Sequence, residues 1–206
     1  MDFFLLGTRG LDRDGRPSER LKPLGMGSEF CSKIERRTVT QITADHSSWS
    51  KIQKHLLPRY PRCEEAAFLF GYYTTSHNSI AIADYVLMSK SDFISQTIDY
   101  LELTDEARRR IIKRAYDIGA CLIEVHSHPG DQPACFSIAD FLGFEETVPH
   151  MQWRLRGQPY GAIVVSNNSF DALVWKPNSK SPTSITNLKI GYDLLFPTNL
   201  SFRRWQ

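Results

Sequence analysis

The sequence lacks several features that would place it in a specialised class of protein. Its four cysteines lie far apart and form no CxxC pair, so neither a cysteine-rich zinc site nor a disulfide framework is indicated. No stretch approaches the roughly 18 consecutive apolar residues of a membrane span. The start, MDFFLLGTRG, has no basic segment and only a very short apolar run, unlike a signal peptide. We therefore expect a cytoplasmic protein with reduced thiols and no membrane partner.

The sequence also has little net charge. It contains 25 basic and 23 acidic residues, which give a formal net charge of +2 over 206 residues. Proteins that bind duplex nucleic acid usually concentrate basic residues on one face, so we expect no nucleic-acid partner. The 41% hydrophobic content is ordinary for a globular protein and is sufficient for a substantial core.

The residue pattern divides the chain into three parts. Residues 1–33 mix glycine, arginine, aspartate and proline with short apolar stretches, which is typical of an arm or loop-rich extension. From residue 34 to residue 177 the patterns of strands and helices are clear, and this stretch is the expected catalytic domain. Residues 178–206 are expected to form a C-terminal extension that packs on the domain.

Hydrophobic periodicity predicts the elements of residues 34–177. A strand near residues 34–45 precedes a helix capped by Ser48, and apolar runs at 66–75 and 79–88 predict a hairpin. Thr104 and Gly119 bound a second helix, which leads into a buried strand at 120–126. A third helix begins near Ser137, and residues 160–165 and 170–175 form a later strand pair. This order predicts an α/β sandwich with a mixed sheet.

The residues suited to chemistry are concentrated in the segment EVHSHPGDQPACFSIAD. Two histidines at a spacing of two leave the end of a strand, so His126 and His128 point to the same side and both reach one ion. Asp140 lies about one turn inside the next helix and can face that pair. Three protein ligands of this kind leave a position for water, as in a hydrolytic zinc site.

Such a site also needs a carboxylate that takes a proton from the water. Glu64 and Glu65 are both candidates, because they open the apolar strand AAFLFG. The start of this strand lies beside the metal if it runs antiparallel to the strand that ends at His126. The residue pattern alone leaves the choice between the two glutamates open.

These residues resemble the signature of the JAMM/MPN metalloproteases, which is a glutamate, then H-S/T-H-P, seven residues and S-x-x-D. Every defined position and spacing is present, in His126, Ser127, His128, Pro129, Ser137 and Asp140. The glutamate of the family usually stands seven residues before a glycine, as Glu64 does before Gly71. This alignment selects Glu64. One departure is Ala67, where many members have glycine.

The resemblance implies a fold, a cofactor and a set of roles. It implies an MPN-type, cytidine-deaminase-like layered sandwich in which helices flank a mixed β-sheet. One zinc ion (Zn²⁺) would be held by His126, His128 and Asp140, with Glu64 as general base and then acid. Ser137 would stabilise the tetrahedral oxyanion.

Members with an intact motif cut the amide or isopeptide bond after the C-terminal glycine of ubiquitin or a ubiquitin-like protein. The implied partner is therefore a ubiquitin-like protein or its conjugates. The short chain is similar to prokaryotic members encoded beside activating and conjugating enzymes, some of them in phage-defence operons. Those enzymes are further expected partners.

Several alternatives stay open from the sequence. Ser137 with Asp140 is also the pattern of a helix capping box, and capping and catalysis can coexist. Glu124 shares the side-chain direction of the two histidines and is a candidate supporting group. Cys135 is either a plain thiol or a redox gate on the zinc.

A non-catalytic MPN scaffold is the alternative function, although such members typically lose motif residues. A zinc deaminase is disfavoured because its P-C-x-x-C pattern is absent, and a DNA-repair relative is disfavoured by the balanced charge.

Overall fold

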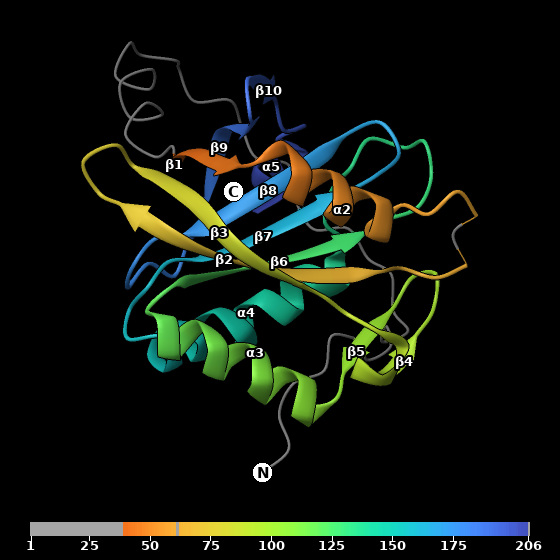
Figure 1. The fold of residues 1–206 in the computed structure, drawn as a ribbon, viewed down its shortest axis with the longest axis horizontal. Coiled ribbons are helices and arrows are strands. Elements are labelled where there is room, and N and C mark those ends of the chain that lie inside the picture. Colours follow the sequence, from red (N-terminus) through yellow and green to blue (C-terminus); the bar gives the residue numbers. More distant parts are fainter. Residues whose placement is uncertain (1–38, 61, 206) are drawn as a thin grey trace, which may run out of the picture.

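The computed structural model describes residues 39–60 and 62–205, so the expected arm at residues 1–33 lies outside the described part (Figure 1). The strands are β1 (Val39–Ala44), β2 (Ala66–Thr74), β3 (Ser79–Leu87), β4 (Phe93–Gln96), β5 (Leu101–Leu103), β6 (Cys121–Ser127), β7 (Tyr160–Val165), β8 (Phe170–Trp175), β9 (Thr183–Ile190) and β10 (Asp193–Leu195). The helices are α2 (His46–Leu56), the short 3-10 helix η2 (Lys90–Asp92), α3 (Asp105–Ile118), α4 (Ile138–Arg154) and α5 (Leu200–Trp205).

The main sheet closes on itself. Its strand order is β1-β3-β2-β6-β7-β8-β9, and β1 also pairs in parallel with β9, with Val39 opposite Ile185. The β1–β3 and β6–β7 pairs are parallel, whereas the β2–β3, β2–β6, β7–β8 and β8–β9 pairs are antiparallel. The structure is therefore a closed, seven-stranded mixed β-barrel.

The predicted MPN-type sandwich, with a mixed sheet flanked by helices, is therefore wrong. The pairing that overturns it joins β1 to β9, which are more than 130 residues apart in the chain. The described residues form four α-helices of 6 to 17 residues, and the sheet on which they pack is closed rather than open. Local periodicity reports which residues form strands but carries no information on a pairing of this range.

Two hydrophobic clusters lie on opposite faces of the barrel strands. Along β6, Ile123 and Val125 belong to one cluster and Leu122 to the other, as the alternation of side chains in a strand requires. The first cluster also holds the apolar face of α2, including Trp49 and Ile52. The second cluster is covered by α3, α4 and α5, and Figure 1 shows α3 and α4 side by side below the strands.

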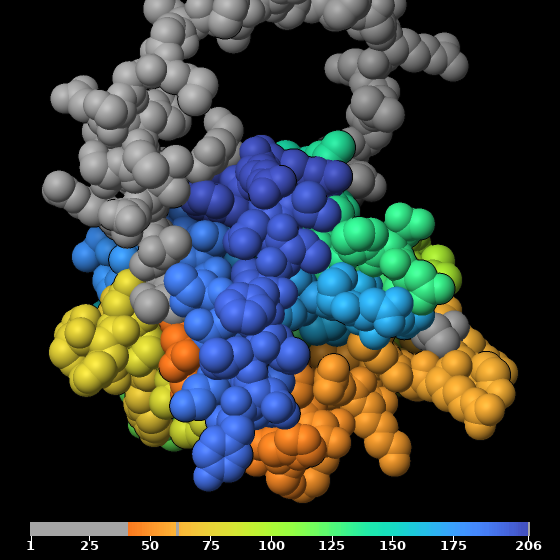
Figure 2. Space-filling view, turned by 90° about the horizontal axis from the view of Figure 1, so that it is seen from above, coloured from red at the N-terminus to blue at the C-terminus, as the bar shows by residue number. Residues whose placement is uncertain are grey.

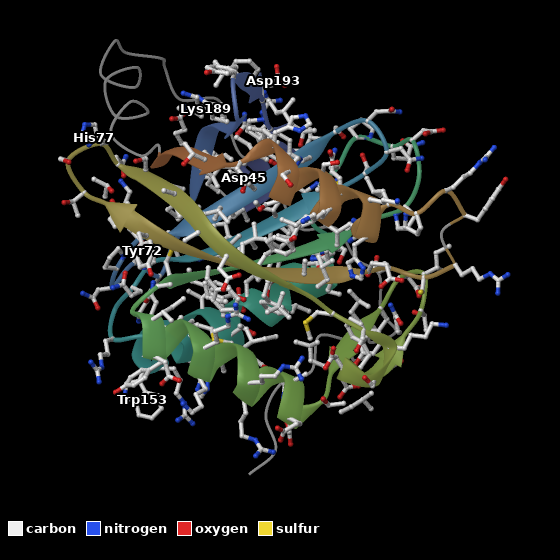
Figure 3. The ribbon with its side chains drawn as sticks, viewed as in Figure 1. Asp45, Tyr72, His77, Trp153, Lys189 and Asp193 are labelled. Carbon is white, nitrogen blue, oxygen red and sulfur yellow. The ribbon has the colours of Figure 1, made fainter. Side chains whose placement is uncertain are left out.

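The predicted capping residues of α3 are confirmed, whereas the predicted cap of α2 is wrong. The Thr104 side chain accepts a hydrogen bond from the Ala107 N–H, and Gly119 ends α3 in a left-handed conformation with φ of 64°. Helix α2 begins before Ser48, because the cap is Asp45, which is labelled in Figure 3. The Asp45 side chain accepts a hydrogen bond from the Ser48 N–H at 2.8 Å. Ser48 is thus inside the first turn.

Further elements were not predicted from the sequence. Strands β4 and β5 form a separate small sheet, and residues 183–195 supply β9 and β10 of the main sheet. Helix α5 follows and packs Phe202 and Trp205 against the second hydrophobic cluster, which α3 and α4 also cover. A search of the described ranges finds no helix with the length and apolar character needed to cross a bilayer.

Gly71 marks the point where the β2–β3 register shifts. A Cβ atom at this position would lie 2.6 Å from Ile80 Cγ2 and 3.0 Å from the Ala81 carbonyl oxygen. We expect Gly71→Ala to lower the free energy of unfolding by about 1–3 kcal/mol, because the strands cannot approach as closely. Urea denaturation measures this change, with the exposed Ala81→Ser as a control expected to stay within about 0.5 kcal/mol. Equal free energies of unfolding for Gly71→Ala and Ala81→Ser would show that a Cβ atom at residue 71 fits between the strands.

Candidate metal centre

The pairing of β2 with β6 brings two distant parts of the sequence together. The strands are antiparallel, and Ala66 lies opposite His126. The start of β2 therefore lies at the end of β6, where the histidines leave the strand. The sequence-based expectation that the Glu64–Glu65 segment adjoins the histidines through antiparallel pairing is confirmed.

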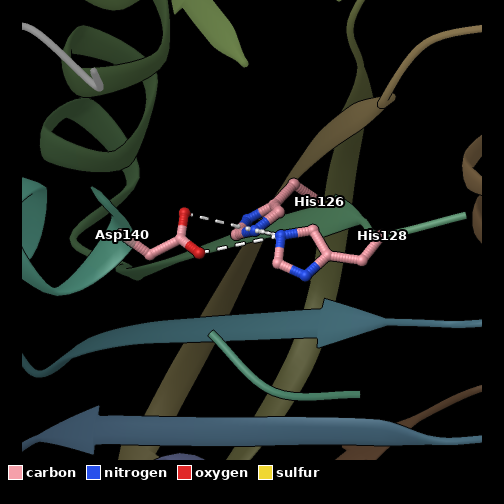
Figure 4. Close-up of side chains that lie close together, drawn as sticks. All are labelled: His126, His128 and Asp140. Atoms are coloured by element: carbon pink, nitrogen blue, oxygen red, sulfur yellow. Dashed lines mark hydrogen bonds and ion pairs between the residues drawn. The ribbon is translucent and has the colours of Figure 1, made fainter. Parts of the chain in front are cut away.

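Three predicted ligands meet at this point (Figure 4). The Nε2 atoms of His126 and His128 are 3.2 Å apart. Asp140 Oδ1 lies 3.5 Å from Nε2 of His126, and Oδ2 lies 3.7 Å from Nε2 of His128. All the potential ligand atoms lie within 4.8 Å of one another. The cluster could hold a metal ion.

The spacing of these atoms suits a tetrahedral ion. Metal–ligand distances of about 2.0–2.2 Å at tetrahedral angles place the ligand atoms about 3.3–3.6 Å from each other. The 3.2 Å between the two Nε2 atoms and the 3.5 Å from His126 Nε2 to Asp140 Oδ1 lie close to these values, whereas the 3.7 Å contact of His128 is to the other carboxylate oxygen, Oδ2. Two imidazoles and one carboxylate form a donor set suited to zinc and to other first-row divalent metals.

The electrostatics of the cluster favour positive charge among the three ligands. Burial lowers the pKa of His126, but the adjacent Asp140 carboxylate outweighs this effect and raises the pKa to about 9. Burial and the charge on His126 lower the pKa of His128 to about 4. Burial raises the pKa of Asp140, but the charge on His126 outweighs it and holds the pKa well below its usual range. A metal cation between the ligands would be stabilised by the same carboxylate charge of Asp140.

Glu64 faces the cluster and Glu65 does not. The Glu64 carboxylate Oε1 lies 3.5 Å from His128 Nε2, and burial raises the pKa of Glu64 to about 7. The Glu65 carboxylate instead accepts hydrogen bonds from Gln96 Nε2 at 3.0 Å and from the Cys63 thiol. The two neighbouring glutamates therefore point to different surroundings, and only Glu64 is placed beside the histidines.

The backbone of Glu64 is fixed by the small β4–β5 sheet. Its N–H donates to the Thr97 carbonyl at 2.7 Å, and its carbonyl accepts from Gln96 Nε2 at 2.9 Å. On the other side, the Glu65 N–H donates to Ser127 Oγ at 2.9 Å. These bonds hold the residue just before β2 against the end of β6. Gln96 and Thr97 thus position Glu64, and the sequence alone gave no signal for either of them.

Ser137 is the cap of α4. Its hydroxyl donates to Asp140 Oδ2 at 2.8 Å, and the Asp140 carboxylate accepts from the Ser137 N–H at 2.6 Å. The capping box expected as an alternative is confirmed. It also fixes the orientation of the Asp140 carboxylate, so that Oδ1 faces His126. The predicted role of Ser137 in stabilising an oxyanion stays a prediction.

The C-terminal segment fastens the loop between His128 and Asp140. The Thr198 hydroxyl donates to the Ala134 carbonyl, and Ser201 Oγ accepts from the Phe136 N–H, at 2.7 and 2.8 Å. Figure 2 shows the dark-blue C-terminal residues against the green segment that leads towards α4. Sequence reasoning missed this contact, because isolated serine and threonine residues in a tail carry no pattern.

The chain has also been compared with known proteins. No model of a protein family matches it. A search of curated proteins likewise finds no match. The case for a function therefore rests on the motif and on the geometry of the site.

Proposed function

We propose that this protein is a zinc-dependent protease or isopeptidase of the JAMM type. The observation that carries the proposal is the placement of a buried carboxylate, that of Glu64, 3.5 Å from His128, a member of a His-His-Asp cluster that could hold a metal ion. A set of three ligands leaves a position open for water, whereas structural zinc sites usually have four protein ligands. The same two-histidine, one-carboxylate set also occurs in non-haem iron sites. The adjacent Glu64 favours hydrolysis.

The residues of the chain would divide the reaction between them. When bound, zinc would supply a Lewis acid and lower the pKa of water. Glu64 would take a proton from the attacking water and deliver it to the leaving amine, a sequence that suits a carboxyl group with a pKa raised by burial. His126, His128 and Asp140 would hold the ion. The Ser137 hydroxyl would turn its hydrogen from Asp140 Oδ2 to the developing oxyanion.

The proposed substrate is a ubiquitin-like protein or its conjugate, cut after the C-terminal glycine. The match of the sequence to the full H-S-H-P, S-x-x-D signature supports this substrate class. An extended tail of this kind reaches a buried metal site more readily than a folded chain does. The small β4–β5 sheet lines the same cavity as the potential ligands, and an extended tail would pair with its edge.

Metal analysis together with a cleavage assay tests the proposal. Wild-type protein and His128→Ala are purified without chelators, and zinc and iron are measured per chain alongside cleavage of a panel of ubiquitin-like fusions. We expect about one zinc per wild-type chain, loss of zinc in His128→Ala, and cleavage after the terminal glycine by wild type alone. Iron in place of zinc would reject the hydrolase, and the absence of any specific metal would favour a non-catalytic scaffold.

A further inference from the structure

A cavity of about 310 Å³ extends inward from the metal centre. The cavity begins at Glu64 and the three potential ligands and continues between the strands and the β4–β5 sheet. Its walls are mainly apolar. They include Ala66, Phe68, Phe93, Leu101, Leu103 and Ala139. Neither the metal cluster nor Glu64 requires a cavity of this depth.

A further carboxylate, that of Glu124, lines this cavity. Glu124 is on β6, two residues before His126 and on the same face, so it lies about 7 Å further along the strand. It is opposite Phe68 of β2 and Ala162 of β7. Tyr160, on the same face of β7, donates its hydroxyl hydrogen to the Glu124 carboxylate. The apolar walls thus lead from the metal to a polar group.

The carboxyl group of Glu124 has unused capacity to accept hydrogen bonds. An ionised carboxylate offers about four acceptor positions. Among the described residues, the Tyr160 hydroxyl is the hydrogen-bond donor found for Glu124. A partly buried carboxylate with one donor is incompletely solvated, and a cation that enters the cavity would compensate its charge.

The charged residues that line the cavity also favour a cationic ligand. Its described lining contains the carboxylates of Glu64, Asp99, Glu124 and Asp140, but no lysine or arginine. Two of these, Glu64 and Asp140, belong to the metal centre. Glu124 and the exposed Asp99 remain as two further acidic residues of this lining, and Glu124 also lines a smaller neighbouring cavity that includes Arg108. A cavity with apolar walls and one sign of charge concentrates ligands of the opposite sign.

We propose that this cavity binds a lysine or arginine side chain of the polypeptide that is cleaved, at a position next to the scissile bond. The aliphatic stem packs against Phe68 and the β4–β5 residues, and the cationic end reaches Glu124. This inference rests on the proposed function for its substrate, a polypeptide, but the binding of a basic side chain can be measured without hydrolysis.

Binding of small probes tests the cavity directly. Nα-acetyl-lysine methylamide and its norleucine counterpart are titrated into the full chain and followed by NMR chemical shifts. We expect the lysine probe to bind about tenfold more tightly than the norleucine probe, the effect of one charge-assisted hydrogen bond. In Glu124→Gln the two probes should bind within about twofold of each other. The matched control is Glu102→Gln on β5, whose carboxylate contacts the Tyr100 hydroxyl and does not line this cavity.

Two further measurements separate this inference from its rivals. Zinc content of Glu124→Gln should equal that of wild type, whereas loss of zinc would show that Glu124 supports His126 instead and would overturn the proposal. If Glu124→Gln does not fold, Ala139→Leu narrows the cavity beside α4 and should weaken both probes. Unchanged binding of the lysine probe to that variant would also reject the cavity as its site.

Cleavage then shows which proposal fails, if one does. With peptide or fusion substrates that carry lysine or norleucine beside the scissile bond, wild type should prefer lysine about tenfold in kcat/KM, and Glu124→Gln should lose the preference. Hydrolysis without any lysine preference would overturn the cavity proposal and leave the protease intact. Selective binding of the lysine probe without hydrolysis of any substrate would support the cavity and count against the protease.

Discussion

Glu64→Gln is expected to lower kcat/KM for a cleaved ubiquitin-like fusion by about 10²–10⁴-fold while zinc stays at the wild-type level. Glutamine keeps the size of the side chain but cannot accept the proton from water. Glu64 is not one of the three clustered ligands, so its charge is not required to hold the ion. Steady-state kinetics and metal analysis of the same preparations measure both effects.

Glu65→Gln is the matched control for this prediction. The Glu65 side chain faces Gln96 and Cys63 rather than the metal centre, so this variant should retain most of the wild-type activity. An inactive Glu65→Gln beside an active Glu64→Gln would show that the general base has been assigned to the wrong glutamate. Loss of zinc in Glu64→Gln would instead make Glu64 a ligand.

Asp171→Ala is expected to lower the free energy of unfolding by about 3 kcal/mol or more. Asp171 is fully buried on β8, and its carboxylate accepts hydrogen bonds from three backbone N–H groups. The donors are Ala172, Asn199 and Ser201, at 2.9, 3.1 and 2.8 Å. Without the carboxylate, two of these bonds no longer tie the C-terminal segment to the barrel. Urea denaturation measures the loss.

The same variant should weaken zinc binding, although Asp171 does not contact the metal centre. Thr198 and Ser201 hold the loop that leads to Asp140, and both belong to the segment that Asp171 anchors. Asp131→Ala serves as a control, because Asp131 is exposed and its contact with Asn167 lies on the surface. A stability change in Asp131→Ala as large as that in Asp171→Ala would show that the buried carboxylate has no special role. If Asp171→Ala is destabilised but binds zinc with wild-type affinity, the C-terminal segment does not support the metal centre.

Much of the candidate site follows from local sequence rules. The spacing of two in an extended strand directs His126 and His128 to one side, whatever the strand pairs with. A serine followed three residues later by an acidic residue caps a helix, which sets the direction of Asp140. Glu64 and Glu65 could not be told apart by such rules. The signature spacing to Gly71 favoured Glu64, and the structure places its carboxylate next to His128.

The contacts that hold and surround the site could not be predicted in the same way. Gln96 and Thr97 reach Glu64 from the β4–β5 sheet, and Ser201 reaches Phe136 from 65 residues away. Each is a single polar residue in a segment without periodicity. Glu124 did stand out by its direction on the strand, but the cavity that it lines is built from five separate elements, β2, β4, β5, β6 and α4.

The sequence by itself determined the three residues that could hold a metal ion, the candidate base and most of the strands and helices that carry them, because spacing along a strand or helix fixes the direction of side chains over short distances. Only the tertiary structure decided that the sheet closes into a barrel through β1 and β9, and that the C-terminal residues complete both the barrel and the support of the metal centre. These features depend on hydrogen bonds and apolar contacts between residues 60 to 150 positions apart, and no local pattern encodes which distant strand will be the partner.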